Sequence, residues 1–334
     1  MHRVSPFLAE FSAPNVPMQE LATFYDTSGV DRGTLRDRPY TWTNSVSTLD
    51  GFMHFESTEA VRRAEQCTRA SEKNTQEHGS IESDIALKNH PVAGKFSLAD
   101  YRLLNAGWVF ADAVLASGAC VRVDPGLHHC PIFEDMLEHR KSVLGKPLNP
   151  INLVITASAA VFDYAHHALF NASDLYVVVI TTETDRIAAE TAYLASRSMD
   201  SASKLWEGQA PANAVGTVRF VSLSSAVSNI AEVHLPTALH FIKHELGVHF
   251  LEVDAGGSTI HRMIDLKLVD EMRWTQTGQL IGSRDAGGLH RPSLLGAEGM
   301  ASYDAKTSVV FRTLGIRAIG DHHLFMRYAL EYRH

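Results

Sequence analysis

The chain has 334 residues, of which 45% are hydrophobic and 20% are charged. This is the composition of a globular protein with enough apolar side chains for a full core, and it leaves room for one large domain or two small ones. The formal net charge of -8 argues against broad nucleic-acid binding, which requires a basic face.

Three cysteines, Cys67, Cys120 and Cys130, are too few for a disulfide framework, and none lies in a CxxC pair. This favours a reducing compartment. Residues 1–17 lack the long apolar run of a signal peptide. No apolar stretch reaches the ~18 residues that a membrane span needs. We therefore expect a cytoplasmic protein that binds neither membranes nor nucleic acids.

The first part of the chain is polar. Residues 1–36 are rich in Pro, Ser, Thr and Asp, and we expect an N-terminal extension rather than a core element. We expect residues 37–334 to form one domain. Its first strand, 38–46, is rich in aromatic and β-branched residues and is followed by a turn at 48–51. A polar segment at about 56–97 predicts a solvated insertion or a lid over an active site.

From residue 98 onward, short apolar strands alternate with helices. We predict helices at 98–107, 131–143, 184–196, 236–246 and 259–268, and strands at 113–116, 151–155, 175–180, 219–223 and 248–253. This alternation predicts a buried, mostly parallel sheet covered on both sides. Two alternating segments, 308–319 and 324–333, joined by residues 320–323, predict an antiparallel hairpin.

The turn between strand 248–253 and helix 259–268 has the clearest chemical pattern. Asp254 is followed by the small residues Ala255, Gly256 and Gly257, which let backbone N–H groups approach a ligand. A helix N-terminus carries unpaired N–H groups and partial positive charge, which suits a pyrophosphate. Ligands of parallel sheets bind at the carboxyl ends of the strands, where this turn lies. The alternative is a plain strand-to-helix turn, because two glycines alone are a weak signal.

The segment around this turn resembles the reductase domain of the bifunctional riboflavin-biosynthesis deaminase-reductase, a relative of the dihydrofolate reductase fold. The matching residues are Val253-Asp254-Ala255-Gly256-Gly257-Ser258, with no gap before Leu268-Val269-Asp270-Glu271. In that family a strand precedes Glu-(Gly/Ala)-Gly-Pro-Thr, and the next helix ends in Leu-Val-Asp-Glu. Thr48-Leu49-Asp50-Gly51 and the segment 100–125 resemble two further motifs in the same order. The resemblance covers about residues 37–334 without the insertion.

The resemblance implies a dihydrofolate-reductase-like fold of three α/β/α layers, a small-molecule substrate, NADPH as hydride donor, and a homodimer. By position, the residues that line the cofactor would be Val46, Thr48, Cys120, Ser158, Ala255, Gly256, Gly257, Ser258, Thr259 and Ile260. Cys120 stands where the family has a threonine, so a hydroxyl hydrogen bond is lost or weakened there. Asp254 would face the substrate.

Two positions depart from the family. The riboflavin-pathway substrate carries a ribose phosphate, which the family holds with two arginines. Here one position is Asn105, and the other, after Leu127, reads His128-His129-Cys130. None of these offers the bidentate charged fork of arginine, and two lost contacts cost about 1.5–3 kcal/mol each. We therefore expect Asn105, Leu127, His128 and Asp254 to bind a different substrate, one without that phosphate.

The expected reaction is hydride transfer to a C=N or C=O carbon. Three carboxylates at strand ends, those of Asp50, Asp124 and Asp254, are candidates to orient the substrate or relay a proton. Asp50 and Asp124 are also plausible as ordinary turn residues. Two other functions stay open: a reductase-like protein that binds nucleotide or ligand without catalysis, and a pterin or dihydrofolate reductase.

The sequence predicts no metal centre. His244 and Glu245 do not begin an HExxH motif, because three residues separate Glu245 from His249 and the segment runs from a helix into a strand. His240 and His244 lie one helical turn apart, but an exposed helix face accounts for them better than a metal site does.

Overall fold

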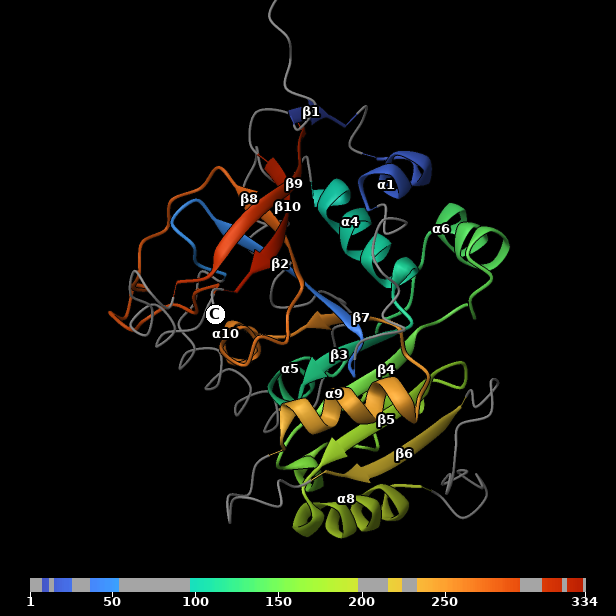
Figure 1. Ribbon diagram of the computed structural model, residues 1–334. Helices are drawn as coiled ribbons and strands as arrows, with labels where there is room; N and C mark the ends of the chain where they lie inside the picture. Colours follow the sequence, from blue (N-terminus) through green and yellow to red (C-terminus); the bar gives the residue numbers. More distant parts are fainter. Residues whose placement is uncertain are drawn as a thin grey trace, which may run out of the picture. The chain divides into compact units, whose positions relative to one another are not determined.

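The computed structural model describes residues 8–11, 15–25, 37–53, 97–197, 216–223, 233–294, 308–319 and 323–332. The chain forms two compact units, and each has its own part of the sheet (Figure 1). Unit 1 contains Met1–Asp26, Trp42–Ala106 and Gly256–His334, and unit 2 contains Thr27–Thr41 and Gly107–Ala255. The predicted insertion lies outside the described residues except at its last residue.

Unit 2 contains a parallel sheet with the strand order β7-β3-β4-β5-β6. The strands are β3 (Ala113–Ser117), β4 (Ile151–Ile155), β5 (Tyr176–Thr181), β6 (Thr217–Ser222) and β7 (Phe250–Asp254). Every residue of β3 and β5 is buried, as in a sheet whose two faces are both covered. The predicted buried parallel sheet is confirmed.

The helices of unit 2 connect these strands. They are α5 (Gly118–Val123), α6 (Glu134–Glu138), α7 (Ala168–Asn171), α8 (Glu183–Ala195) and α9 (Leu235–His244), with a short 3-10 helix, η3 (Ala159–Val161). Thr182 caps α8, because its side chain accepts from the N–H of Asp185. The helix predicted at 131–143 is instead two pieces, α6 and a π-helical turn, η2 (His139–Val143).

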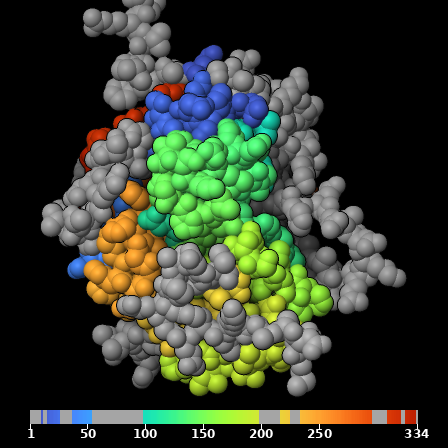
Figure 2. All heavy atoms as spheres, turned by 90° about the vertical axis from the view of Figure 1, so that its right-hand side faces the viewer, coloured from blue at the N-terminus to red at the C-terminus, as the bar shows by residue number. Residues whose placement is uncertain are grey.

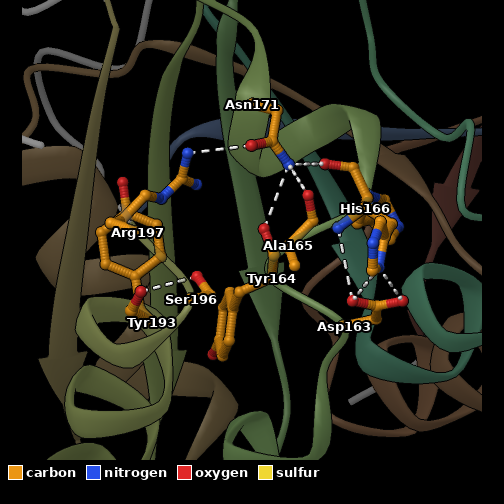
Figure 3. Close-up of polar contacts among 9 residues, drawn as sticks. Asp163, Tyr164, Ala165, His166, Asn171, Tyr193, Ser196 and Arg197 are labelled. Carbon is orange, nitrogen blue, oxygen red and sulfur yellow. Dashed lines mark hydrogen bonds and ion pairs between the residues drawn. The ribbon is translucent and has the colours of Figure 1, made fainter. Parts of the chain in front are cut away.

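A polar network holds the connection between β4 and β5 in place (Figure 3). The side-chain amide of Asn171 donates to the carbonyls of Tyr164 at 3.1 Å, Ala165 at 3.3 Å and His167 at 2.8 Å. Arg197 donates to the Asn171 oxygen at 2.8 Å, and its guanidinium lies over the ring of Tyr193. Asn171 therefore joins the end of α8 to the loop that follows η3.

Arg140 fixes the end of the long helix α4 (Ser97–Phe110). Its side chain is 1% exposed, and its Nη1 donates to the carbonyls of Trp108, Val109 and Ala111 at 2.7–2.8 Å. Its Nε donates to the carbonyl of Pro147 at 2.5 Å. The last carbonyls of a helix have no intrahelical partner, and a cation there also suits the helix dipole. The α6–η2 segment that contains Arg140 is drawn in green at the surface in Figure 2.

Unit 1 contains a mixed sheet with the strand order β1-β9-β10-β8-β2. Its strands are β1 (Leu8–Glu10), β2 (Tyr40–Thr48), β8 (Glu271–Thr277), β9 (Val310–Ile319) and β10 (His323–Glu331). The first two residues of β2 belong to unit 2. β9 and β10 pair antiparallel, so the predicted C-terminal hairpin is confirmed, and so is the α/β class. The hairpin of β9 and β10 is drawn in red in Figure 1.

The prediction that residues 1–36 contain no core element was wrong for two segments. β1 pairs in parallel with β9. Helix α1 (Met18–Phe24) buries Met18, Leu21 and Phe24. Both segments belong to unit 1.

The prediction that a helix extends through Leu268 was also wrong. Helix α10 (Gly257–Asp265) ends earlier, and Lys267 has a positive φ of 57°. Such a left-handed residue ends a helix. Glu271, the last residue of the motif, begins β8, a strand that the sequence did not indicate.

Strand β8 carries a buried charge cluster. Glu271 is fully buried between two arginines, with Arg273 Nε at 2.8 Å and Arg327 Nε at 2.7 Å from its Oε1. The Arg273 guanidinium lies between the rings of Tyr25 and Trp42, at 4.3 and 4.1 Å. Burial raises the pKa of Glu271, but the two arginines outweigh it and hold that pKa at about 2.

A second acid in unit 1, the partly buried Asp100, gives a pH-dependent prediction. Burial raises the pKa of Asp100, on α4, to about 6, against a hydrogen bond from Thr275 that lowers it. The unfolded chain loses this proton near pH 3.8, the ordinary pKa of an aspartate. The stability that the partly buried, protonated carboxyl group contributes therefore falls as pH rises from 3.8 through 6. We expect Asp100→Asn to raise the free energy of unfolding by about 3 kcal/mol at pH 7 and to change it little at pH 4.

Urea unfolding at both pH values measures this. The prediction fails if the substitution stabilises equally at both values, or if it destabilises at pH 7. Thr275→Val is a separate check on the hydrogen bond, because it removes the donor and leaves Asp100 in place.

Among the helices of the described residues, none is both long and apolar enough to span a membrane.

Candidate active site

The candidate site in unit 2 lies where three parallel strands end. β3 ends at Ser117, β4 at Ile155 and β7 at Asp254, and β3 pairs with both of the others. Parallel strands end at the same edge of a sheet, so the segments that follow β3 and β4 begin at the edge where β7 ends. The predicted residues Cys120, Asp124, Ser158 and Asp254 all follow or end these strands.

Helix α5 and the residues after β4 are linked at this edge. The hydroxyl of Ser117 caps α5 by accepting from the N–H of Cys120 at 3.3 Å, and it donates to the Cys120 sulfur at 3.2 Å. Arg122 Nη1 lies 3.4 Å from the hydroxyl of Ser158. A positive side chain therefore lies beside one of the residues predicted to bind the cofactor.

Asp254 pairs with a histidine. The Nε2 atom of His129 is 3.1 Å from Oδ2 of Asp254, with side-chain exposures of 2% and 14%. The two atoms are at ion-pair distance without the alignment of a hydrogen bond. The ring of Trp108 meets that of His129 edge to face, at 5.4 Å between centroids. The histidine is therefore enclosed, and the carboxylate is the more accessible member of the pair.

Asn152, on β4, holds His129 at two points. The backbone N–H of His129 donates to Oδ1 of Asn152 at 2.8 Å, and Nδ2 of Asn152 donates to the carbonyls of His129 at 3.1 Å and Pro150 at 3.2 Å. The Nδ1 atom of the His129 ring lies 3.2 Å from the same Oδ1. In the sequence, His129 stands out only as one residue of the altered loop His128-His129-Cys130.

The predicted phosphate-binding turn leads into α10, in unit 1. Gly256 is the N-cap residue, with φ -65° and ψ 157°, and no side chain caps the helix. The N–H groups of Thr259 and Ile260 bond to the carbonyl of Gly256, at 2.9 and 3.3 Å. A Cβ atom built on Gly256 meets nothing within 4 Å. The first turn of α10 thus presents backbone N–H groups next to open space, which fits an anionic ligand.

Asp50 has the contacts of a residue that shapes a loop. Its carboxylate accepts from the hydroxyl of Thr48 at 2.6 Å and from the N–H groups of Ile281 at 3.1 Å and Gly282 at 2.7 Å. Burial raises the pKa of Asp50, but these hydrogen bonds outweigh it and lower that pKa. A carboxyl group with a lowered pKa is a poor proton donor near neutral pH. Val46, also in unit 1, is buried in β2.

The predicted substrate residues are found in different surroundings. Asn105 is fully buried in α4, and its amide donates to the carbonyl of Tyr101 at 2.9 Å. Leu127 packs against the core of unit 2. His128 has its Nδ1 atom 2.8 Å from the carbonyl of Gly126, and Asp124 accepts from the N–H of Gly126 at 2.9 Å. These contacts are those of a structured turn.

The thiol of Cys130 and a surface cluster of Asp37, His240 and His244 are two further candidates for reactive or metal-binding side chains. Burial, followed by the charge of Asp174, raises the pKa of the Cys130 thiol to about 12, so this thiol is a poor nucleophile. The ligand atoms of Asp37, His240 and His244 lie within 4.8 Å of one another, and all three residues are exposed. Because all three are exposed on the surface, we assign no metal to them.

No family model and no curated protein sequence matches the chain. Among solved structures, a pyrimidine reductase-like protein from Corynebacterium diphtheriae is similar, with a TM-score of 0.52 and 14% identity over 88% of this chain and 92% of that one. RibD from Acinetobacter baumannii is similar in two forms, both with a TM-score of 0.50, at 14% and 12% identity. This chain spans 61% and 59% of those RibD chains, and they cover 90% and 89% of it. The similarity shows that the chain has the fold of these pyrimidine reductase-like structures.

Proposed function

We propose that this protein is an NADPH-dependent reductase that transfers a hydride to a C=O or C=N carbon of a small substrate. The observation that carries the proposal is the uncapped first turn of α10, directly after β7, in a chain with the fold of pyrimidine reductase-like structures. The amide groups of this turn suit the pyrophosphate of a dinucleotide.

The residues at the two candidate regions support this cofactor. In unit 1, the amides at the start of α10, those of Gly257 and Ser258 above all, would bind the phosphates, because the space beside Gly256 is open. In unit 2, Arg122 donates to the hydroxyl of Ser158, one of the predicted cofactor contacts. Val46, Thr48, Cys120 and Ala255 remain predicted contacts, and a homodimer remains predicted as well.

The substrate is proposed to lack the ribose phosphate of the riboflavin-pathway substrate. The segment after Asp124 offers His128, His129 and Cys130 in place of an arginine, and the His128 ring is engaged with the Gly126 carbonyl. Asn105 is buried within its helix. Neither position supplies the planar, permanently charged group that binds a phosphate well.

Titration of the protein with each nucleotide, followed by the quenching of tryptophan fluorescence, tests the proposal. We expect NADPH to bind at least about tenfold more tightly than NADH, since one charge-assisted contact to the extra phosphate contributes about 1.5–3 kcal/mol. Failure of both nucleotides to bind at millimolar concentration would overturn the cofactor assignment. Equal affinity would overturn the preference for NADPH.

A further inference from the structure

His129, Asn152 and Asp254 form a buried polar array whose protonation follows from its hydrogen bonds. Asn152 donates through Nδ2 to two backbone carbonyls, so its Oδ1 atom is fixed as an acceptor. The Nδ1 atom of His129 faces this acceptor at 3.2 Å and must therefore carry a hydrogen.

The other ring nitrogen then sets the proton count of the pair. In a neutral imidazole with a hydrogen on Nδ1, the Nε2 atom has only a lone pair. This atom lies 3.1 Å from Oδ2 of Asp254 without hydrogen-bond alignment, and a carboxylate oxygen is also an acceptor. Two acceptor atoms this close, in a site where both side chains are largely shielded from water, are unfavourable. A proton on either atom removes the conflict, as an imidazolium beside a carboxylate or as an imidazole beside a carboxylic acid.

The two members of the pair differ in access. The side chain of His129 is 2% exposed and that of Asp254 is 14% exposed. Trp108 covers the imidazole, and Asp254 ends its strand at the edge where the candidate cofactor residues of unit 2 gather. A proton held by this pair therefore leaves by way of the Asp254 carboxyl group.

We propose that the His129–Asp254 pair stores the proton that the reduction consumes, with Asp254 as its donor to the substrate and His129 as the positioning residue that keeps Asp254 supplied. This inference rests on the proposed function. Bound NADPH would supply a hydride to the carbon of the C=O or C=N bond. The π electron pair moves onto the oxygen or nitrogen, which takes a proton from the Asp254 carboxyl group.

The protons of this transfer balance within the His129–Asp254 pair. When the proton is on Nε2 of His129, it passes to Asp254 as Asp254 protonates the substrate. The pair is left as a neutral imidazole and a carboxylate, and one proton from water restores it. The substrate gains a hydride and a proton in total. The sulfur of Cys130 and the ring of His128 take no part in this transfer.

The proton count can be measured without any nucleotide. NMR of the full chain labelled with ¹⁵N-histidine and ¹³C-aspartate reports the ring nitrogens of His129 and the carboxyl carbon of Asp254, and His129→Gln and Asp254→Asn assign the signals. We expect either two protonated ring nitrogens with an ionised carboxylate, or a bare Nε2 with a protonated carboxyl group. A bare Nε2 beside an ionised Asp254, or a bare Nδ1, at neutral pH would overturn the proposal.

The catalytic part is tested with NADPH and a panel of simple carbonyl and cyclic imine compounds as probes. For any probe that is reduced, we expect Asp254→Asn to lower kcat by at least about 100-fold while leaving the KM for NADPH unchanged. His129→Gln keeps a neutral donor next to Asp254 and is expected to lower kcat with both KM values preserved. An unchanged kcat in Asp254→Asn would overturn the proposal.

The two proposals fail separately. If neither nucleotide binds in the fluorescence titration, the proposed function falls, whatever the NMR shows. If NADPH binds and the NMR shows an ionised Asp254 beside an unprotonated Nε2 of His129, only the proposal that the pair stores a proton is overturned. Thermal unfolding of both variants checks that they are folded, so a lost activity is not attributed to an unfolded protein.

Discussion

Replacing Arg140 with methionine is expected to lower the free energy of unfolding by about 3–5 kcal/mol. The change removes the donor for the carbonyls of Trp108, Val109, Ala111 and Pro147. The carbonyls of α4 are the last ones of the helix and have no intrahelical partner, and a buried acceptor that loses its donor costs about 1–3 kcal/mol. The methionine side chain fills most of the space, so lost packing contributes little.

Two variants separate the loss of the hydrogen bonds from other effects. Lys141→Met removes an exposed cation from the neighbouring position of the same π-helical turn, and we expect less than about 0.5 kcal/mol. Arg140→Lys keeps the charge but loses the donor to Pro147 and the planar geometry, so its effect is expected to lie between the two. Urea unfolding followed by circular dichroism measures all three. If Arg140→Met and Lys141→Met lower the free energy of unfolding equally, Arg140 does not cap the end of α4.

The second large effect is expected at the cofactor turn, where Gly256→Asp should weaken NADPH binding by at least about 100-fold, or ~2.8 kcal/mol. The new carboxylate would occupy the open space in front of α10 and repel the phosphates. The backbone at Gly256 is extended, with φ -65°, so an aspartate fits there without strain. Aspartate is also a good N-cap, and the variant is expected to be at least as stable as the parent.

Gly256→Asn is the matched control for the Gly256→Asp prediction. Asparagine has the same size and also caps helices well, but it carries no charge. We expect Gly256→Asn to bind NADPH with an affinity between those of the parent and Gly256→Asp. If Gly256→Asp binds NADPH as the parent does, α10 does not hold the phosphates. Unfolding curves of the three proteins show whether any loss comes from the fold.

The sequence predicted the strands of unit 2 well because each is short, apolar and buried. It did not indicate β8, whose residues Glu271 and Arg273 are buried as a charged pair. Strands are recognised in a sequence by alternating apolar and polar residues, and buried charged residues in place of apolar ones hide that alternation in β8. It also placed the end of α10 too late, because Lys267 takes a left-handed conformation that glycine usually marks. β1 was missed because its partner strand, β9, is some 300 residues away in the chain.

For the site, the sequence could place residues at strand ends but not state their partners. Asp254 was identified by its motif, and Asp50 could be assigned either to a turn or to catalysis. The hydrogen bonds of Asp50 favour the turn. His129 was missed as a functional candidate because the contact depends on three segments, 125–131, β4 and β7, that come together only in the folded chain.

The most direct measurement of the central claim is amide hydrogen exchange with and without NADPH. The N–H groups of Gly257 and Ser258, the first two of α10, have no intrahelical acceptor and should exchange quickly in the free protein. If NADPH binds as proposed, exchange slows at residues 256–260, while the buried strand β5 exchanges at the same rate. NADPH that binds without protecting residues 256–260 would contradict the account.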